Sequence, residues 1–225
     1  MAPTNQEKHE EAYRAAEEAV HSGEPAFLAE RAGVEWRALP DARGGAMVIP
    51  SLGSTARLSW PDLVFQSESP LLMSFPWRLI ALHYLAGVTG REPEGDWISY
   101  RELPDGLFYA NTVTREVEEP LAALFGRSAD AFQAAGRPMG AEVGDVADSS
   151  LVLRPLPRVP MLFALWLADE EFPAKVKVLY DRIGAGNLPL QDLRILADLL
   201  GAALKSRAPG EDDAIDRPSE AGPNG

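Results

Sequence analysis

The chain has 225 residues, of which 46% are hydrophobic, and it carries a formal net charge of −13. This length fits one domain with an ample core. Because the sequence contains no cysteine, it can form neither a disulfide nor a cysteine-ligated zinc or iron–sulphur site. A nucleic-acid-binding protein needs a basic stripe, and none is visible. We find neither an apolar signal segment nor a run near the roughly 20 apolar residues of a membrane span. We therefore expect a cytoplasmic protein that binds neither nucleic acid nor membrane.

The first third of the chain predicts two helices followed by a group of short strands. Residues 5–22 are rich in Ala and Glu and predict a surface helix. Residues 25–33 predict a second short helix that ends at Gly33. Turn-forming residues then separate four predicted strands at 34–38, 46–50, 56–60 and 63–66.

A helix predicted over residues 76–88 carries the most interesting histidine, His83. Apolar residues occupy most of this helix, so we expect it to be largely buried. His83 is either an axial ligand or acid–base group, or a packed histidine bonded to a backbone carbonyl. The other histidines, His9 and His21, lie about three turns apart on a surface helix and do not share a face. They therefore predict no metal site.

A charged pair follows the short strand predicted at 97–100. Arg101 and Glu102 stand immediately before a Leu-Pro-Asp-Gly turn at 103–106. Two interpretations fit this position. The pair either clamps an anionic ligand or forms an internal ion pair that fixes the turn.

Residues 158–181 predict two strands joined by an acidic loop. The run 159–168 is almost continuously apolar, which is typical of a central strand buried on both faces, with Trp166 largely buried. Residues 175–180 alternate lysine and valine, the pattern of a half-buried strand. We expect an antiparallel hairpin, with residues 151–153 as a third strand beside it.

The acidic loop itself contains Asp169, Glu170 and Glu171. Clustered carboxylates can serve as acid and base or bind a hard cation. They can equally form a solvated loop or pair with Lys175 and Lys177. The five tryptophans could stack on a planar cofactor, although aromatic residues at strand and helix spacing more often form the core.

Further helices are predicted in the second half, and a tail closes the chain. The glycines at 184–186 predict a loop, and residues from 207 onward offer little to bury. We predict a single α+β domain at 1–206, with a mixed or antiparallel sheet of short strands packed with helices, and a disordered acidic tail at 207–225. The remaining helices are expected at 110–124, 128–135 and 190–205, so both ends of the domain are helical.

No catalytic signature stands out, since the sequence lacks a nucleophile elbow, a P-loop, a dinucleotide fingerprint and a zinc-protease motif. A buried helix with one polar residue must pack on the sheet, and that residue then needs a partner. We therefore predict a ligand site between His83 and either Asp169 with Glu171 or Arg101 with Glu102.

Three segments carry a family resemblance: WISYRELPDGLFY at 97–109, VEEPLAALFG at 117–126, and RVPMLFALWLADEEFPAKVKVLYD at 158–181. In order and spacing they resemble the prokaryotic family known as domain of unknown function 3786, over roughly residues 8 to 205. The resemblance implies an anaerobic source and an association with iron–sulphur segments or corrinoid-dependent one-carbon enzymes. Because the chain has no cysteine, an iron–sulphur or corrinoid centre would belong to a partner protein.

Sequence and resemblance together predict an accessory or small-molecule-binding protein linked to redox or one-carbon cofactor metabolism, with an unknown cofactor. The alternative is a cofactor-free hydrolase or isomerase that uses a His/carboxylate pair. The two differ in geometry, because an enzyme needs His83 and a carboxylate in one concave pocket.

Overall fold

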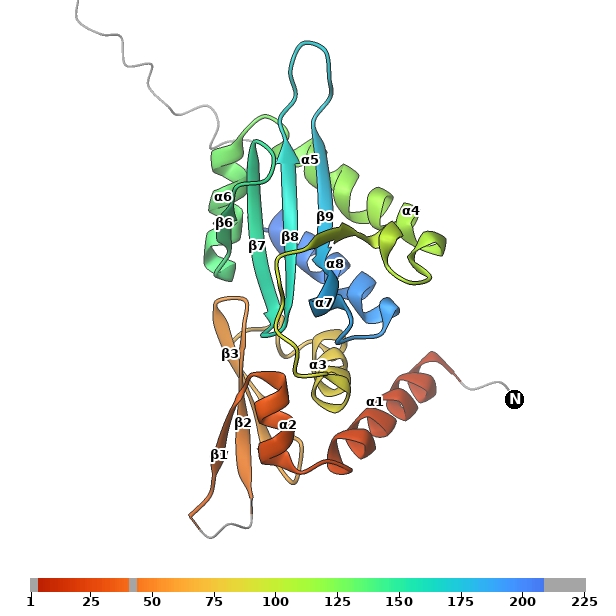
Figure 1. Ribbon diagram of the computed structural model, residues 1–225, viewed down its shortest axis with the longest axis vertical. Helices are drawn as coiled ribbons and strands as arrows, with labels where there is room; N and C mark the ends of the chain where they lie inside the picture. The colour runs from red at the N-terminus through yellow and green to blue at the C-terminus, as the bar shows by residue number, and fades with distance from the viewer. Residues whose placement is uncertain (1–3, 41–43, 209–225) are drawn as a thin grey trace, which may run out of the picture.

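The fold is α+β, as predicted, with two antiparallel sheets of short strands and helices around them (Figure 1). The computed structural model describes residues 4–40 and 44–208. The predicted tail therefore lies almost entirely outside the described residues.

Sheet A is built by the first part of the chain, in the order β1-β2-β3-β4. Its strands are β1 (Glu35–Ala38), β2 (Gly45–Ser51), β3 (Ser54–Trp60) and β4 (Phe65–Gln66). Two helices precede it, α1 (Asn5–His21) and α2 (Pro25–Ala32). Helix α2 ends at Gly33, whose φ of 65° is the left-handed conformation that glycine adopts most easily. The predicted helices and strands of this region are confirmed.

Sheet B has five strands in the order β5-β9-β8-β7-β6. They are β5 (Trp97–Ser99), β6 (Glu142–Gly144), β7 (Ser149–Leu156), β8 (Val159–Trp166) and β9 (Lys175–Asp181). The predicted hairpin is β8 and β9, and β8 is central because it pairs with β7 on its other side. Sequence reasoning missed β6 and placed only three residues of β7.

The prediction that Trp166 is largely buried was wrong, because this residue lies at the exposed end of β8. Met161, Phe163 and Leu165 point into the main core, while alternate residues point to the other face. All residues from Val159 to Leu165 are buried, but Trp166, at the strand end, is 36% exposed. The central position of β8 stands, because ladder pairing on both edges establishes it independently of Trp166.

Helices cover the core side of sheet B. In Figure 1, α8 crosses behind the sheet, with α5 and α6 toward its two edges. The α-helices that follow sheet A in the sequence are α3 (Phe75–Gly87), α4 (Ala110–Val113), α5 (Glu119–Phe125), α6 (Ala129–Gly136), α7 (Arg182–Ala185) and α8 (Leu190–Lys205). A π-helical turn (Thr114–Glu118) interrupts the single helix predicted at 110–124. Residues 184–186 were predicted as a loop, but Gly184 and Ala185 belong to α7, whose first turn is capped by the Asp181 side chain, and Gly186 follows its last residue.

The two sheets share one cluster of buried apolar side chains. They also meet through the backbone of β7. The Ser51 hydroxyl donates to the Pro155 carbonyl at 2.8 Å, and the Trp77 indole donates to the same oxygen at 3.3 Å. Helix α3, which carries His83, thereby lies against the junction of both sheets.

Candidate functional site

His83 and Asp192 form a hydrogen-bonded pair between α3 and α8. The imidazole Nδ1 lies 2.7 Å from a carboxylate oxygen of Asp192. The Asp192 side chain is only 7% exposed, whereas that of His83 is 31% exposed. Asp192 also lies in the first turn of α8, where the helix dipole favours a negative charge. The predicted polar partner of His83 therefore exists, but it is a different carboxylate from those predicted.

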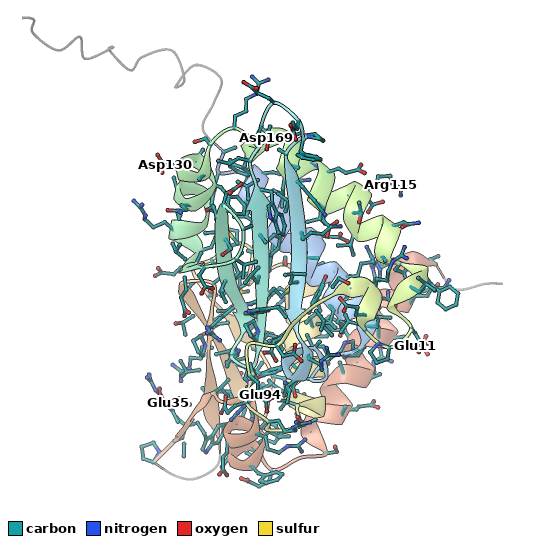
Figure 2. The ribbon with its side chains drawn as sticks, turned by 45° about the horizontal axis from the view of Figure 1, so that its top comes forward. Glu11, Glu35, Glu94, Arg115, Asp130 and Asp169 are labelled. Atoms are coloured by element: carbon teal, nitrogen blue, oxygen red, sulfur yellow. The ribbon has the colours of Figure 1, made fainter. Side chains whose placement is uncertain are left out.

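The structure does not bring His83 together with Asp169 and Glu171. Helix α3 meets β8 near its beginning, where the Arg158 N–H donates to the Tyr84 hydroxyl at 3.2 Å. The acidic loop follows the other end of this eight-residue strand, which at about 3.3 Å per residue is roughly 25 Å away. Figure 2 shows Asp169 at the far end of the hairpin. A joint site of His83 and the acidic loop is therefore not formed.

Asp169 holds the loop that it begins. Its Oδ1 accepts hydrogen bonds from the backbone N–H groups of Glu171 and Phe172, at 2.8 and 2.6 Å. This is the local turn that aspartate favours. Of the alternatives for this loop, pairing with Lys175 and Lys177 does not occur among the described residues. Lys177 instead binds Glu118, and Lys175 lies over the Trp166 ring.

A pocket of 650 Å³ opens beside this loop, and we term it the hairpin pocket. Three charged side chains, Asp148, Asp169 and Lys175, line it. Its apolar lining comes from Trp166, Leu167, Phe172, Pro173 and Ala174. Phe172 is 66% exposed, and the Lys175 ammonium lies 5.7 Å from the centre of the Trp166 ring. The pocket thus presents aromatic surface next to ionisable groups.

Glu102 does not pair with Arg101. Its Oε2 accepts from the Ser99 N–H at 2.8 Å and from the Ser99 hydroxyl at 2.7 Å, and these bonds lower the pKa of the Glu102 carboxyl. No ion pair between Arg101 and Glu102 forms in the part of the chain that the structure describes. A serine cap thus holds residues 99–102, immediately before the turn, and Glu102 is used for this cap rather than for the predicted ion pair.

A second pocket, of 460 Å³, lies between this turn and the connection from α7 to α8, and we term it the α7–α8 pocket. Glu102 and Arg182 are its two charged lining residues. Most of its wall is apolar and comes from Ile98, Leu103, Pro104, Leu188, Leu190 and Leu193. Arg101 and Glu171, two of the predicted site residues, line neither pocket.

Sequence reasoning missed a buried polar cluster around the π-helical turn. Glu118 is 7% exposed and accepts hydrogen bonds from Lys177 Nζ at 2.6 Å, the Thr114 hydroxyl at 2.8 Å and the Val178 N–H at 3.1 Å. Strand β5 pairs with β9 only at residues 179–181, so Glu118 satisfies an N–H on the free part of that edge. No sequence pattern distinguishes this glutamate from exposed neighbours such as Glu116.

Two further groups with raised pKa values, Tyr180 and Asp198, belong to β9 and α8. Burial raises the pKa of Tyr180 well above its usual range, and its hydroxyl has no hydrogen-bond partner within the described residues. Burial also raises the pKa of Asp198, although Arg194, 2.5 Å away, opposes the shift. π-Helical turns often occur at functional sites, but these groups line neither the hairpin pocket nor the α7–α8 pocket.

The described residues offer no group of three or more His, Asp or Glu side chains placed to hold a metal ion. Within the same residues, no helix has both the length and the apolarity needed to cross a membrane.

Comparison with protein families identifies the chain. The model of the family described as domain of unknown function (DUF3786) matches residues 24–202. Since this match covers most of the chain, the protein belongs to that family. Neither the curated proteins nor the solved structures contain a significant match.

Proposed function

We propose that this DUF3786 protein binds a small organic molecule in the hairpin pocket. The observation that carries the proposal is the pairing of a 650 Å³ cavity with the exposed rings of Trp166 and Phe172. This volume lies within the range of about 300–1,000 Å³ that is typical of ligand sites. When a flat ligand stacks on an exposed aromatic ring, the contact stabilises the complex by about 0.5–1.5 kcal/mol per stacked pair beyond the burial of apolar area.

The charges around the pocket favour a planar ligand that is neutral or positive. Two carboxylates and one ammonium line it, from Asp148, Asp169 and Lys175. One oxygen of each carboxylate accepts hydrogen bonds from backbone N–H groups. The second oxygens accept no hydrogen bond from the described residues, so they remain for a ligand. Glu170 and Glu171 are exposed on the same loop and add negative charge. An aromatic cation is attracted both by the ring faces and by this field.

The proposal extends to the setting of this binding. Some members of the family that this chain resembles are fused to iron–sulphur-binding segments or encoded near corrinoid-dependent one-carbon enzymes. This association suggests that the ligand belongs to redox or one-carbon cofactor metabolism in an anaerobe. It also suggests that the protein acts as an accessory to a cofactor-bearing partner. A mass spectrum of the protein purified natively without oxygen would test both points. Finding neither a bound small molecule nor such a partner would remove this setting.

Two dyes of opposite charge test the pocket. Thioflavin T is a planar cation and 8-anilinonaphthalene-1-sulfonate is an aromatic anion. We expect thioflavin T to bind one site more tightly than the anionic dye, with quenching of Trp166, which is the most exposed of the five tryptophans. Trp166→Ala should abolish this binding. Trp36→Phe, which changes a half-buried tryptophan in sheet A, serves as the matched control.

Asp169→Asn separates charge from loop structure. Asparagine keeps the oxygen that accepts the Glu171 and Phe172 N–H groups but removes the negative charge. We expect thioflavin T affinity to fall about fivefold without loss of stability. Binding that persists in Trp166→Ala, or a preference for the anionic dye, would contradict the proposal.

The His83–Asp192 pair supports a second candidate function, namely acid–base catalysis in a hydrolase or isomerase. A carboxylate on Nδ1 fixes the imidazole so that Nε2 can accept a proton, and His83 is partly exposed. Hydrolysis of 4-nitrophenyl acetate is a simple test. His83→Ala and Asp192→Asn should both lower the rate, whereas Gln191→Ala, at the exposed neighbouring position, should not. Equal rates in all variants would reject this function.

A further inference from the structure

The α7–α8 pocket combines an apolar wall with two opposite charges, and it is separate from the hairpin pocket. The leucines at 103, 188, 190 and 193 line its apolar wall, together with Ile98, Pro104 and Ala185. Glu102 enters from the turn that follows β5, and Arg182 enters from the start of α7. From this arrangement we infer that the pocket binds a free α-amino acid with an apolar side chain.

Both charged groups keep unused hydrogen-bonding capacity. The two bonds from Ser99 go to Oε2 of Glu102, so Oε1 accepts none within the described residues. Arg182 donates from Nε to Asp96 at 2.6 Å, and its two terminal nitrogens donate to no group in the described chain. The guanidinium can therefore still donate a pair of parallel hydrogen bonds to a carboxylate.

Both groups are also held in their charged forms. The Ser99 hydrogen bonds are the main reason that the pKa of Glu102 is lowered, and the Asp96 hydrogen bond is the main reason that the pKa of Arg182 is raised. Each of the two groups also contributes to the shift of the other. Since Glu102 and Arg182 line the same pocket, one small ligand can contact both.

An α-amino acid satisfies these features together. Its ammonium group matches the free Glu102 oxygen, its carboxylate matches Arg182, and its side chain fits the leucine-lined wall. A carboxylic acid without the amine would leave Glu102 facing its carboxylate, which is unfavourable. A peptide end carries only one of the two adjacent charges, and a polar side chain would lose its hydrogen bonds to water against the leucines.

Isothermal titration with leucine, and with two analogues that each lack one charge, tests this inference. Leucinamide keeps the ammonium and 4-methylpentanoate keeps the carboxylate. We expect leucine to bind one site at least tenfold more tightly than either analogue, since each charge-assisted hydrogen bond that is lost weakens binding by about that factor. Methionine should bind like leucine, and aspartate should not bind.

Three variants make the test specific to this pocket. Glu102→Gln keeps an oxygen for the Ser99 bonds and should weaken leucine binding about tenfold or more. Arg182→Lys keeps a positive charge but loses the paired donors, so it should weaken binding less than Arg182→Gln. Arg101→Gln removes a neighbouring exposed charge that does not line the pocket, and it should bind leucine normally.

Circular dichroism of each variant shows whether the fold is kept. The inference is overturned if leucine and methionine fail to bind the wild-type protein. It is also overturned if the analogues bind as tightly as leucine, or if folded Glu102→Gln binds leucine as well as the wild type does.

Discussion

The two ends of β9 differ in the burial of their carboxylates. Before its first residue, the acidic loop exposes Glu170 and Glu171, and Asp169 bonds only to N–H groups of that same loop. At its last residue, Asp181 is completely buried. Its two oxygens accept from Glu94, Gly95 and Gly184 N–H groups at 2.6–2.9 Å. In Figure 2, Glu94 and Asp169 lie at opposite ends of the sheet.

Asp169 stabilises only its own turn, whereas Asp181 joins segments that are distant in the sequence. Asp181 ties the loop before β5 to β9 and α7, segments almost 90 residues apart. An exposed loop carboxylate can be replaced by water, whereas a buried one cannot. The acidic end is thus free to serve a ligand, and the Asp181 end maintains the fold.

The largest effect should come from Asp181→Ala. This change leaves three N–H groups without their acceptor in a buried site, and it should lower the free energy of unfolding by about 4 kcal/mol. Asp169→Ala, its counterpart at the other end of β9, should cost about 1 kcal/mol or less. Urea denaturation measures both. Equal costs would show that the two ends do not differ as described.

Glu118→Ala should follow, with a loss of about 3 kcal/mol. The change removes the acceptor of the Val178 N–H on the edge of β9 and leaves Lys177 unpaired. Lys177→Met should cost less, about 1 kcal/mol, because Glu118 keeps two other donors. If Lys177→Met proves the more costly change, the ion pair matters more than the edge contact.

A smaller effect is expected for Trp166→Ala, at the exposed end of β8. Trp166 is the last residue of β8 and is 36% exposed. We therefore expect the free energy of unfolding to fall by only about 1 kcal/mol. Thermal and urea unfolding both report it. A loss of about 3 kcal/mol or more, the usual cost for a buried aromatic residue, would show that the hairpin pocket is closed in solution.

Local patterns predicted most of the fold, because its elements carry strong local signals. The apolar run of β8, the lysine–valine alternation of β9 and the Gly33 cap each act within a few residues. The missed elements depend on distant contacts. β6 has three residues with little burial and pairs with β7, and the exposure of Trp166 at the end of β8 depends on which elements pack there.

The candidate site was less predictable, since clustering in sequence is a poor guide to burial. The acids that stand together at 169–171 are exposed. The acids that bind other elements, Glu118, Asp181 and Asp192, are scattered along the chain. His83 does bind a carboxylate, that of Asp192 on α8. The packing of α8 against α3 leaves no signal in the local sequence. Among the predicted residues, Glu102 lines the α7–α8 pocket and Asp169 lines the hairpin pocket, and their binding of a ligand stays a prediction.

The smallest effect concerns Asp198, a half-buried residue of α8. Burial raises its pKa above the ordinary value of 3.8, and its Oδ1 is buried without a hydrogen-bond partner among the described residues. As pH rises through 3.8, the unfolded chain releases this proton before the folded protein does, so stability falls until the raised pKa is passed. Asp198→Asn removes this loss, because the amide is uncharged at every pH and its oxygen can still accept from Arg194. The melting temperature of the variant should therefore exceed that of the wild type by about 1 °C at neutral pH, and the gain should vanish below pH 3.8. A gain that is equal at both pH values would mean that packing, not the charge of Asp198, is responsible.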